Sequence, residues 1–197
     1  MIIAHHIILT GYGHWLPNDP RGSISVELRN AALAPLGDIH YGRKAVQPSR
    51  GEIRSFYKDA RGLLKYPVLW FNKVTTQTIG EAFGEVIRSE KLTCYACAVL
   101  RNHAHLVIRR HKIRHGRMIV LFRDASRKAL VEAALAPQDH PVWSLDPFVA
   151  FKDTTAAVRS AIRYVEGNLT KHSMPPQPWG FLTPYDDWPF HKRRASG

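Results

Sequence analysis

The segment Asn-His-Ala-His-Leu-Val-Ile-Arg at positions 102–109 constrains the fold more than any other stretch of the sequence. Its apolar residues Ala104, Leu106 and Ile108 occupy every second position. Successive side chains of a β-strand point to opposite faces, so this alternation predicts a strand over about 103–110 with one buried face. The opposite face carries His103, His105, Val107 and Arg109. Residues 92–101, directly before it, are predicted to form another strand.

Helical periodicity accompanies these strands. Apolar side chains recur three and four residues apart in three further segments, which are predicted to be helices. The segments are 75–90, 113–135 and 154–169. Two more strands are expected, at 3–12 and between 142 and 151. The combination predicts the α+β class, with helices packed on an antiparallel sheet.

The chain is predicted to form a single domain over residues 1–170. Its 197 residues are 45% hydrophobic and 22% charged, values that exclude a disordered, collagen-like or disulfide-scaffold protein. Residues 20–66 look irregular apart from a possible helix at 51–65, and are interpreted as an insertion. Residues 171–197 are rich in Pro and Trp and end in the basic run His191-Lys-Arg-Arg. This segment is expected to be an irregular tail on the surface.

Positive charge dominates the composition and gathers in one segment. The chain has 28 Lys and Arg against 16 Asp and Glu, a net charge of +12. A chain this basic usually binds a polyanion, so nucleic acid is favoured over a merely solvated basic face. Nine basic residues and one acidic residue lie between Arg101 and Lys128. Composition alone does not separate DNA, RNA and acidic membranes. Eight of the nine are the expected contacts to nucleic acid, which are DNA contacts if the resemblance given below holds: Arg109, Arg110, Lys112, Arg114, Arg117, Arg123, Arg127 and Lys128.

The sequence features that bear on localisation favour the cytoplasm. The first residues lack the basic segment and cleavage site of a secretory signal, and no apolar run approaches the ~18 residues of a membrane span. Two cysteines cannot build a disulfide framework. We therefore expect a cytoplasmic, nucleoid-associated protein that does not bind membranes.

His103 and His105 are candidate metal ligands because alternate residues of a strand share a face. Two adjacent imidazoles suit a shared metal ion, although two histidines on a polar face without a ligand remain the alternative. Cys94 and Cys97 could suggest a zinc site, but the histidine spacing is not that of a zinc finger. We expect the two thiols to point to opposite faces of their strand and to be buried and structural.

The last predicted helix places Tyr164 and Asn168 one turn apart on the rim of its apolar face. Asp153 is the expected N-cap of this helix. A tyrosine in such a position often serves amphipathic packing. The histidine pair and the basic segment together favour a functional role instead.

Three stretches resemble the single-tyrosine HUH transposases, that is, the IS200/IS605-like transposases and their REP-associated relatives. Residues 102–108 resemble the histidine strand of the family, which is usually preceded by Met-Pro-Asn, whereas this chain has Leu100-Arg101-Asn102. Residues 162–168 resemble the nucleophile helix, with Leu169 in place of a typical proline. Residues 10–22 resemble the N-terminal strand and loop of one IS200-like subgroup.

The resemblance implies a ferredoxin-like antiparallel sheet with helices on one face, the HUH endonuclease fold. It also implies single-stranded DNA or a DNA hairpin as substrate, Mg²⁺ or Mn²⁺ as cofactor, and a monomer or homodimer. By matching position, His103 and His105 are metal ligands with Asn168 as the third. Tyr164 is the nucleophile that forms a 5′-phosphotyrosine. Tyr185, in the tail, is the alternative nucleophile.

Two other functions remain open. A relaxase or replication initiator of the same HUH class would use similar residues, although such chains are usually longer or carry a second tyrosine motif. A non-catalytic nucleic-acid-binding domain derived from this fold would keep the fold and the charge but not the catalytic residues. The intact set His103, His105, Tyr164 and Asn168 favours the enzyme.

Overall fold

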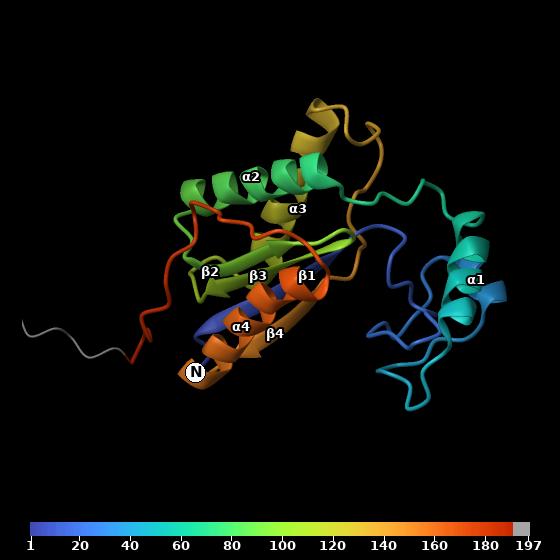
Figure 1. The fold of residues 1–197 in the computed structure, drawn as a ribbon, viewed down its shortest axis with the longest axis horizontal. Coiled ribbons are helices and arrows are strands. Elements are labelled where there is room, and N and C mark those ends of the chain that lie inside the picture. Colours follow the sequence, from blue (N-terminus) through green and yellow to red (C-terminus); the bar gives the residue numbers. More distant parts are fainter. Residues whose placement is uncertain (191–197) are drawn as a thin grey trace, which may run out of the picture.

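The computed structural model describes residues 1–190, which form a four-stranded antiparallel sheet with helices on both faces (Figure 1). The strand order is β2-β3-β1-β4. The strands are β1 (Ala4–Thr10), β2 (Cys94–Val99), β3 (His103–Arg109) and β4 (Phe148–Lys152). The helices are α1 (Arg50–Arg61), α2 (Lys73–Ser89), α3 (His115–Glu132) and α4 (Thr155–Lys171), with a 3₁₀ helix η1 (Ala31–Leu36). None of these helices has the length and apolar composition that crossing a bilayer would require.

The sheet is apolar on both faces in its centre. Leu106 and Ile108 of β3 point toward α2 and α3 and form the larger core with Phe83 and Phe122. Val107 points the other way and packs with Val158 of α4. The predicted α+β class and antiparallel sheet are confirmed. The expectation of helices on one face holds for α2 and α3, whereas α4 covers the opposite face because a second apolar patch there matches its own stripe.

The starts of α4 and of β2 differ from expectation. Thr154, and not Asp153, caps α4, because its side-chain oxygen accepts a hydrogen bond from the backbone N–H of Ala157 at 3.1 Å. A β-bulge between Cys94 and Ala96 brings Cys94 and Cys97 to the same core, so the prediction of opposite faces is wrong. Both thiols are buried and unpaired, and burial raises the pKa of Cys94 to about 12.

Residues 20–66 pack as a small unit beside the sheet, with α1 standing away from the strands (Figure 1). Their core joins Leu33 of η1 and Phe56 of α1 to Leu16, which follows β1. Asn18 ties the parts together by donating hydrogen bonds to the carbonyls of Leu33 at 2.8 Å and Gly37 at 3.1 Å. The insertion is therefore anchored to the loop that leaves β1.

The segment after α4 runs along β2 and α2. Gln177 pairs with both the backbone N–H and the carbonyl of Val99, at 2.9 and 2.8 Å. Trp179 lies against Gly80, where an added Cβ would come within 2.2 Å of its ring. The tail is irregular, as expected, but it covers the free edge of β2 instead of only lying on the surface. The basic run His191-Lys-Arg-Arg lies outside the described residues.

Candidate active site

His103 and His105 project from the same face of β3, as predicted. Their ring centroids lie 4.8 Å apart. The register of the sheet places Thr10 of β1 opposite His103 and Ile8 opposite His105. His105 is only 2% exposed. The pair therefore sits over the centre of the sheet, between β1 and β2, on the side that α4 covers.

Each imidazole has one nitrogen fixed by a neighbour and one left over. Nδ1 of His103 lies 2.7 Å from Oδ1 of Asn102, and since this oxygen can only accept, Nδ1 carries the proton. Nδ1 of His105 lies 3.1 Å from Nε2 of His6. Nε2 of His105 is buried and has no hydrogen-bond partner in the described part of the chain. Leaving a buried polar atom unpaired is costly, so this nitrogen indicates a ligand.

Burial keeps the three imidazoles neutral. It lowers the pKa of His6 and of His103 to about 4 each. Burial, with the neighbouring His103 and His6, lowers the pKa of His105 to about 2. A neutral imidazole is the form that binds a metal ion, so no proton has to be displaced near pH 7.

Helix α4 brings Tyr164 to the histidines. The tyrosine ring lies 5.6 Å from His105 and 5.8 Å from His6, edge to face in both contacts. Tyr164 is 52% exposed, whereas Asn168 is only 4% exposed. One turn beyond Asn168, the ring of His172 lies 6.0 Å from His103. Asn168 therefore lies on α4 between two residues that contact the histidine pair.

Two imidazoles and one amide could together hold a divalent cation. The amide nitrogen of Asn168 donates to the carbonyl of Tyr164 at 2.9 Å, which leaves its amide oxygen available. Within residues 1–190, no three His, Cys, Asp or Glu side chains gather as a metal-binding group. The ligand atoms available are thus two imidazole nitrogens and one amide oxygen. A cation bound by these three would keep coordination positions open for phosphate and water. The orphaned Nε2 of His105 is the observation that favours this use.

His6 was missed by the sequence analysis. His6 is buried on β1 and hydrogen-bonds to His105. In the sequence, however, it looks like any histidine on a buried strand. Only the pairing of β1 with β3, across 99 positions of the chain, brings the two rings together. The neighbouring His5 points to the other face, where it packs against His115.

Tyr185, the alternative nucleophile, is held elsewhere. Its ring packs on Tyr95 with centroids 4.8 Å apart, and its hydroxyl donates to the carbonyl of Trp188 at 3.0 Å. Tyr95 lies three residues before Ala98, the β2 partner of His105, or about 10 Å along the strand. The structure therefore groups Tyr164, and not Tyr185, with the histidines.

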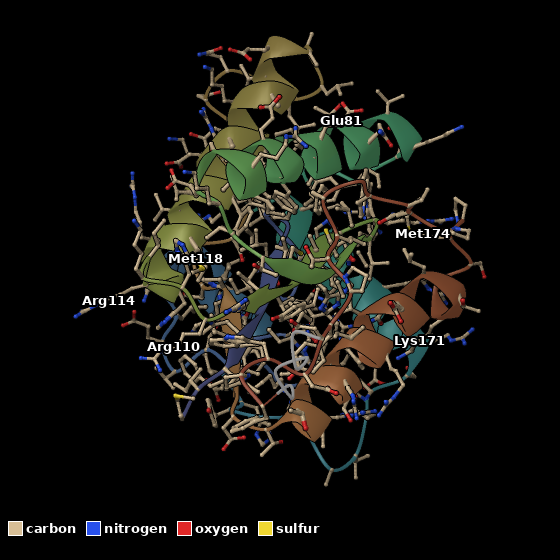
Figure 2. The ribbon with its side chains drawn as sticks, turned by 90° about the vertical axis from the view of Figure 1, so that its left-hand side faces the viewer. Glu81, Arg110, Arg114, Met118, Lys171 and Met174 are labelled. Atoms are coloured by element: carbon tan, nitrogen blue, oxygen red, sulfur yellow. The ribbon has the colours of Figure 1, made fainter. Side chains whose placement is uncertain are left out.

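The eight predicted DNA-contacting residues do not gather at the histidines, and none of them lines the cavity beside Tyr164. Arg110 and Arg114 project outward near the start of α3, on the side of the molecule opposite Lys171 at the end of α4 (Figure 2). Lys112 and Arg117 are exposed in the same region.

The other four make contacts within the chain. Arg109 stacks on Trp188 at 3.7 Å. Arg123 donates to the carbonyl of Leu145 at 3.3 Å, and Lys128 lies 3.7 Å from Glu132. Arg127 donates to the carbonyl of His140 at 2.8 Å. Part of the basic segment is thus engaged in holding the loop after α3.

A cavity of about 790 Å³ opens beside the histidines and Tyr164. It continues along the loop after β1 and into the insertion, whose Arg21, Arg29 and Arg43 line it. These arginines are scattered through an irregular segment, so local charge density did not single them out. The structure nevertheless makes them the basic residues of this cavity.

Comparisons with known proteins give distant structural similarities. No family model matches the chain, and no curated protein matches it. One similar solved structure is a REP-associated tyrosine transposase bound to a REP hairpin, with 12% identity, a TM-score of 0.47, and coverage of 91% of this chain and 74% of that one. Another is a candidate transposase from Deinococcus radiodurans R1, with 12% identity, a TM-score of 0.40, and coverage of 85% and 91%.

Proposed function

We propose that this chain is a metal-dependent tyrosine transposase that cleaves and rejoins single-stranded DNA or DNA hairpins. The observation that carries the proposal is the ring contact of Tyr164 with His105 in the lining of one cavity, where Nε2 of His105 has no hydrogen-bond partner within residues 1–190. If Tyr164 served only for packing at the edge of the helix, its contact with a buried imidazole that lacks a hydrogen-bond partner would have no explanation.

Tyr164 acts as the nucleophile in this proposal. Its phenol gives up its proton to solvent as its oxygen attacks the phosphorus of the DNA backbone, and the bond from phosphorus to the 3′ oxygen of the leaving strand breaks. The electron pair of that bond stays on the 3′ oxygen, which takes up a proton and becomes a free 3′-hydroxyl. The phosphotyrosine ester conserves the bond energy, so a 3′-hydroxyl can later attack it and restore a DNA strand without an external energy source.

His103, His105 and Asn168 would hold the cation, Mg²⁺ or Mn²⁺. When bound, the cation supplies neutralisation of the charge that develops on the phosphate. The chain itself supplies the positions: Asn102 and His6 fix the two imidazole rings, and the shared helix ties Tyr164 to Asn168. The exposure of Tyr164 lets a flexible strand reach its hydroxyl.

The covalent intermediate provides the direct test. The full chain is incubated with Mn²⁺ and end-labelled hairpins whose sequences are taken from the DNA that flanks its gene. We expect a labelled species that keeps the mass of the protein on a denaturing gel. If DNA binds to the chain but never becomes attached, the chain is a nucleic-acid-binding module and the proposal is wrong.

Replacing His6 should weaken the metal site without removing a ligand. In His6→Phe, Nδ1 of His105 loses its hydrogen-bond partner and the ring loses its fixed orientation. Removal of such a supporting group typically costs about 10- to 100-fold in metal affinity or activity. We expect the Mn²⁺ concentration for half-maximal cleavage to rise by that factor and His6→Gln, which retains an acceptor, to lie between the variant and wild type. An unchanged Mn²⁺ dependence in His6→Phe would mean that His6 does not orient His105.

Binding of DNA to the exposed basic residues near the start of α3 should depend on salt. Log affinity for a single strand should fall with log salt by about 0.7 for each phosphate contacted. Charge reversal of Lys112, Arg114 and Arg117 should weaken binding and reduce this slope. The same reversal at Arg50, Arg54 and Lys58 of α1, which are also exposed, controls for total charge. Equal slopes in the two triple variants would exclude a specific role for the α3 residues.

A further inference from the structure

The cavity beside Tyr164 is larger than the catalytic chemistry requires. At about 790 Å³ it lies within the ~300–1,000 Å³ range of pockets that enclose a small organic ligand. One end is lined by His103, His105 and Tyr164, and the other by the loop after β1 and the insertion. The second end has no part in the phosphate chemistry described above.

Trp15 stands in this second end as an aromatic surface. The residue is 45% exposed, although it lines the cavity. Its backbone has φ of +50°, a left-handed conformation that is uncommon for a bulky residue. Such a conformation persists only where surrounding structure enforces it, and it is often found at ligand-binding sites.

Arg21 lies over the Trp15 ring, with its Cζ 3.7 Å from the ring centroid. The guanidinium is itself fixed, because Nε and Nη2 donate to the two carboxylate oxygens of Asp19 at 2.8 and 2.6 Å. Asp19 is 1% exposed and also accepts a hydrogen bond from the hydroxyl of Tyr57 of α1. Burial opposes ionisation of Asp19, but the hydrogen bonds from Arg21 and Tyr57 outweigh it and lower the pKa. The insertion thus holds a rigid guanidinium–indole stack.

The chemistry of this compartment suits a flat aromatic group attached to an anionic chain. Its walls are mostly apolar and include Ile24 and Leu33. Arg43 adds positive charge, whereas the guanidinium of Arg29 is paired with the carboxylates of Glu27 and, at 3.0 Å, of Asp146. Unpaired bases of single-stranded nucleic acid bind in this way, by stacking on aromatic side chains beside basic residues.

We propose that the insertion-walled compartment binds an unpaired nucleobase of the substrate strand, stacked on Trp15. The inference rests on the proposed function, because the cavity is continuous with the site at Tyr164. It gives residues 20–66 a role: their Arg21 and Tyr57 fix the stack together with Asp19 of the preceding loop. The protein would then recognise that its substrate is single-stranded by binding an unpaired base at a site separate from the phosphate that reacts.

The first test compares a short oligothymidylate with an abasic strand of equal length and charge, by fluorescence anisotropy with the full chain. We expect wild type to prefer the oligothymidylate. Trp15→Ala should lose about tenfold or more of the affinity for the oligothymidylate and keep that for the abasic strand. Trp15→Phe should retain part of the preference. Trp70→Ala is the matched control, because Trp70 is 55% exposed but does not line this cavity.

A second measurement uses the unaltered protein, so it does not depend on how the Trp15 variants fold. An oligothymidylate carrying 5-iododeoxyuridine is irradiated in the complex, and the crosslinked peptide is identified by mass spectrometry. We expect the crosslink at Trp15. A crosslink outside the cavity, or a wild type that binds both strands equally, would overturn the inference. Loss of the covalent intermediate with the base preference intact would instead refute the proposed function alone.

Discussion

Tyr164→Phe should abolish covalent attachment of DNA and leave the fold and DNA affinity unchanged. The change removes one hydroxyl from a half-exposed side chain whose ring contacts to His6 and His105 can persist. Loss of a catalytic nucleophile typically costs several orders of magnitude in rate, so we expect at least a roughly 10³-fold fall in cleavage. Denaturing gel electrophoresis of an end-labelled hairpin measures the attached fraction, and anisotropy measures binding.

Two matched variants distinguish Tyr164 from other tyrosines. Tyr12→Phe removes a hydroxyl within the same cavity, and Tyr185→Phe removes the one in the tail. Both should form the intermediate at close to the wild-type rate. The fragment on the 3′ side of the cut should stay on the protein through its 5′ phosphate, and a polymerase should extend the released 3′-hydroxyl. Attachment that survives in Tyr164→Phe and disappears in Tyr185→Phe would refute the assignment.

Replacing both His103 and His105 by Ala should eliminate cleavage with either Mg²⁺ or Mn²⁺. The substitution removes both imidazole donors and leaves Asn168 alone, so the phosphate is no longer oriented or neutralised. We again expect a fall of about 10³-fold or more, with a far-UV circular dichroism spectrum close to wild type. The apolar clusters on both faces of the sheet are unchanged, so we expect the fold to persist although loss of the buried His105 ring leaves a cavity.

Metal removal provides the complementary experiment. A chelator should bring wild type down to the rate of the double variant, and added Mn²⁺ should restore wild type only. His40→Ala, an exposed histidine of the insertion, is the control for loss of a surface imidazole. If the double variant cleaves at the wild-type rate in saturating Mg²⁺ or Mn²⁺, the histidines do not hold the cation.

Features that depend on local periodicity could be predicted from the sequence. The two faces of β3 follow from alternation over seven residues, and the positions of Tyr164 and Asn168 follow from one helical turn. These local rules therefore identified the histidine pair and the two residues of α4. They also gave the α+β class, because each element carries its own apolar pattern.

Features that depend on contacts between distant segments could not be predicted in the same way. The bond between His6 and His105 depends on strand register, and the common side of Cys94 and Cys97 depends on a bulge. The interpretation of the basic segment used charge density alone. Arg127 is part of that segment, yet its guanidinium binds the backbone of the following loop. A count of charges does not distinguish such an arginine from one that is free to bind phosphate.

The central place of β1 in the sheet has a consequence for how the molecule is made. β1 comes first in the chain, but its partners are β3 and β4, and β4 ends at Lys152. At a synthesis rate of about 5–20 residues per second, the nascent β1 waits roughly 7–30 seconds before its second partner has been translated. Pairing over such separations also slows folding, because the long intervening loop loses entropy when it closes. The insertion, whose contacts are short in sequence, can assemble during this interval. The hydrogen bond between His6 and His105 needs only β1 and β3, so the placement of Tyr164 and Asn168 by α4, which follows β4 in the chain, is the last part of the catalytic geometry to form.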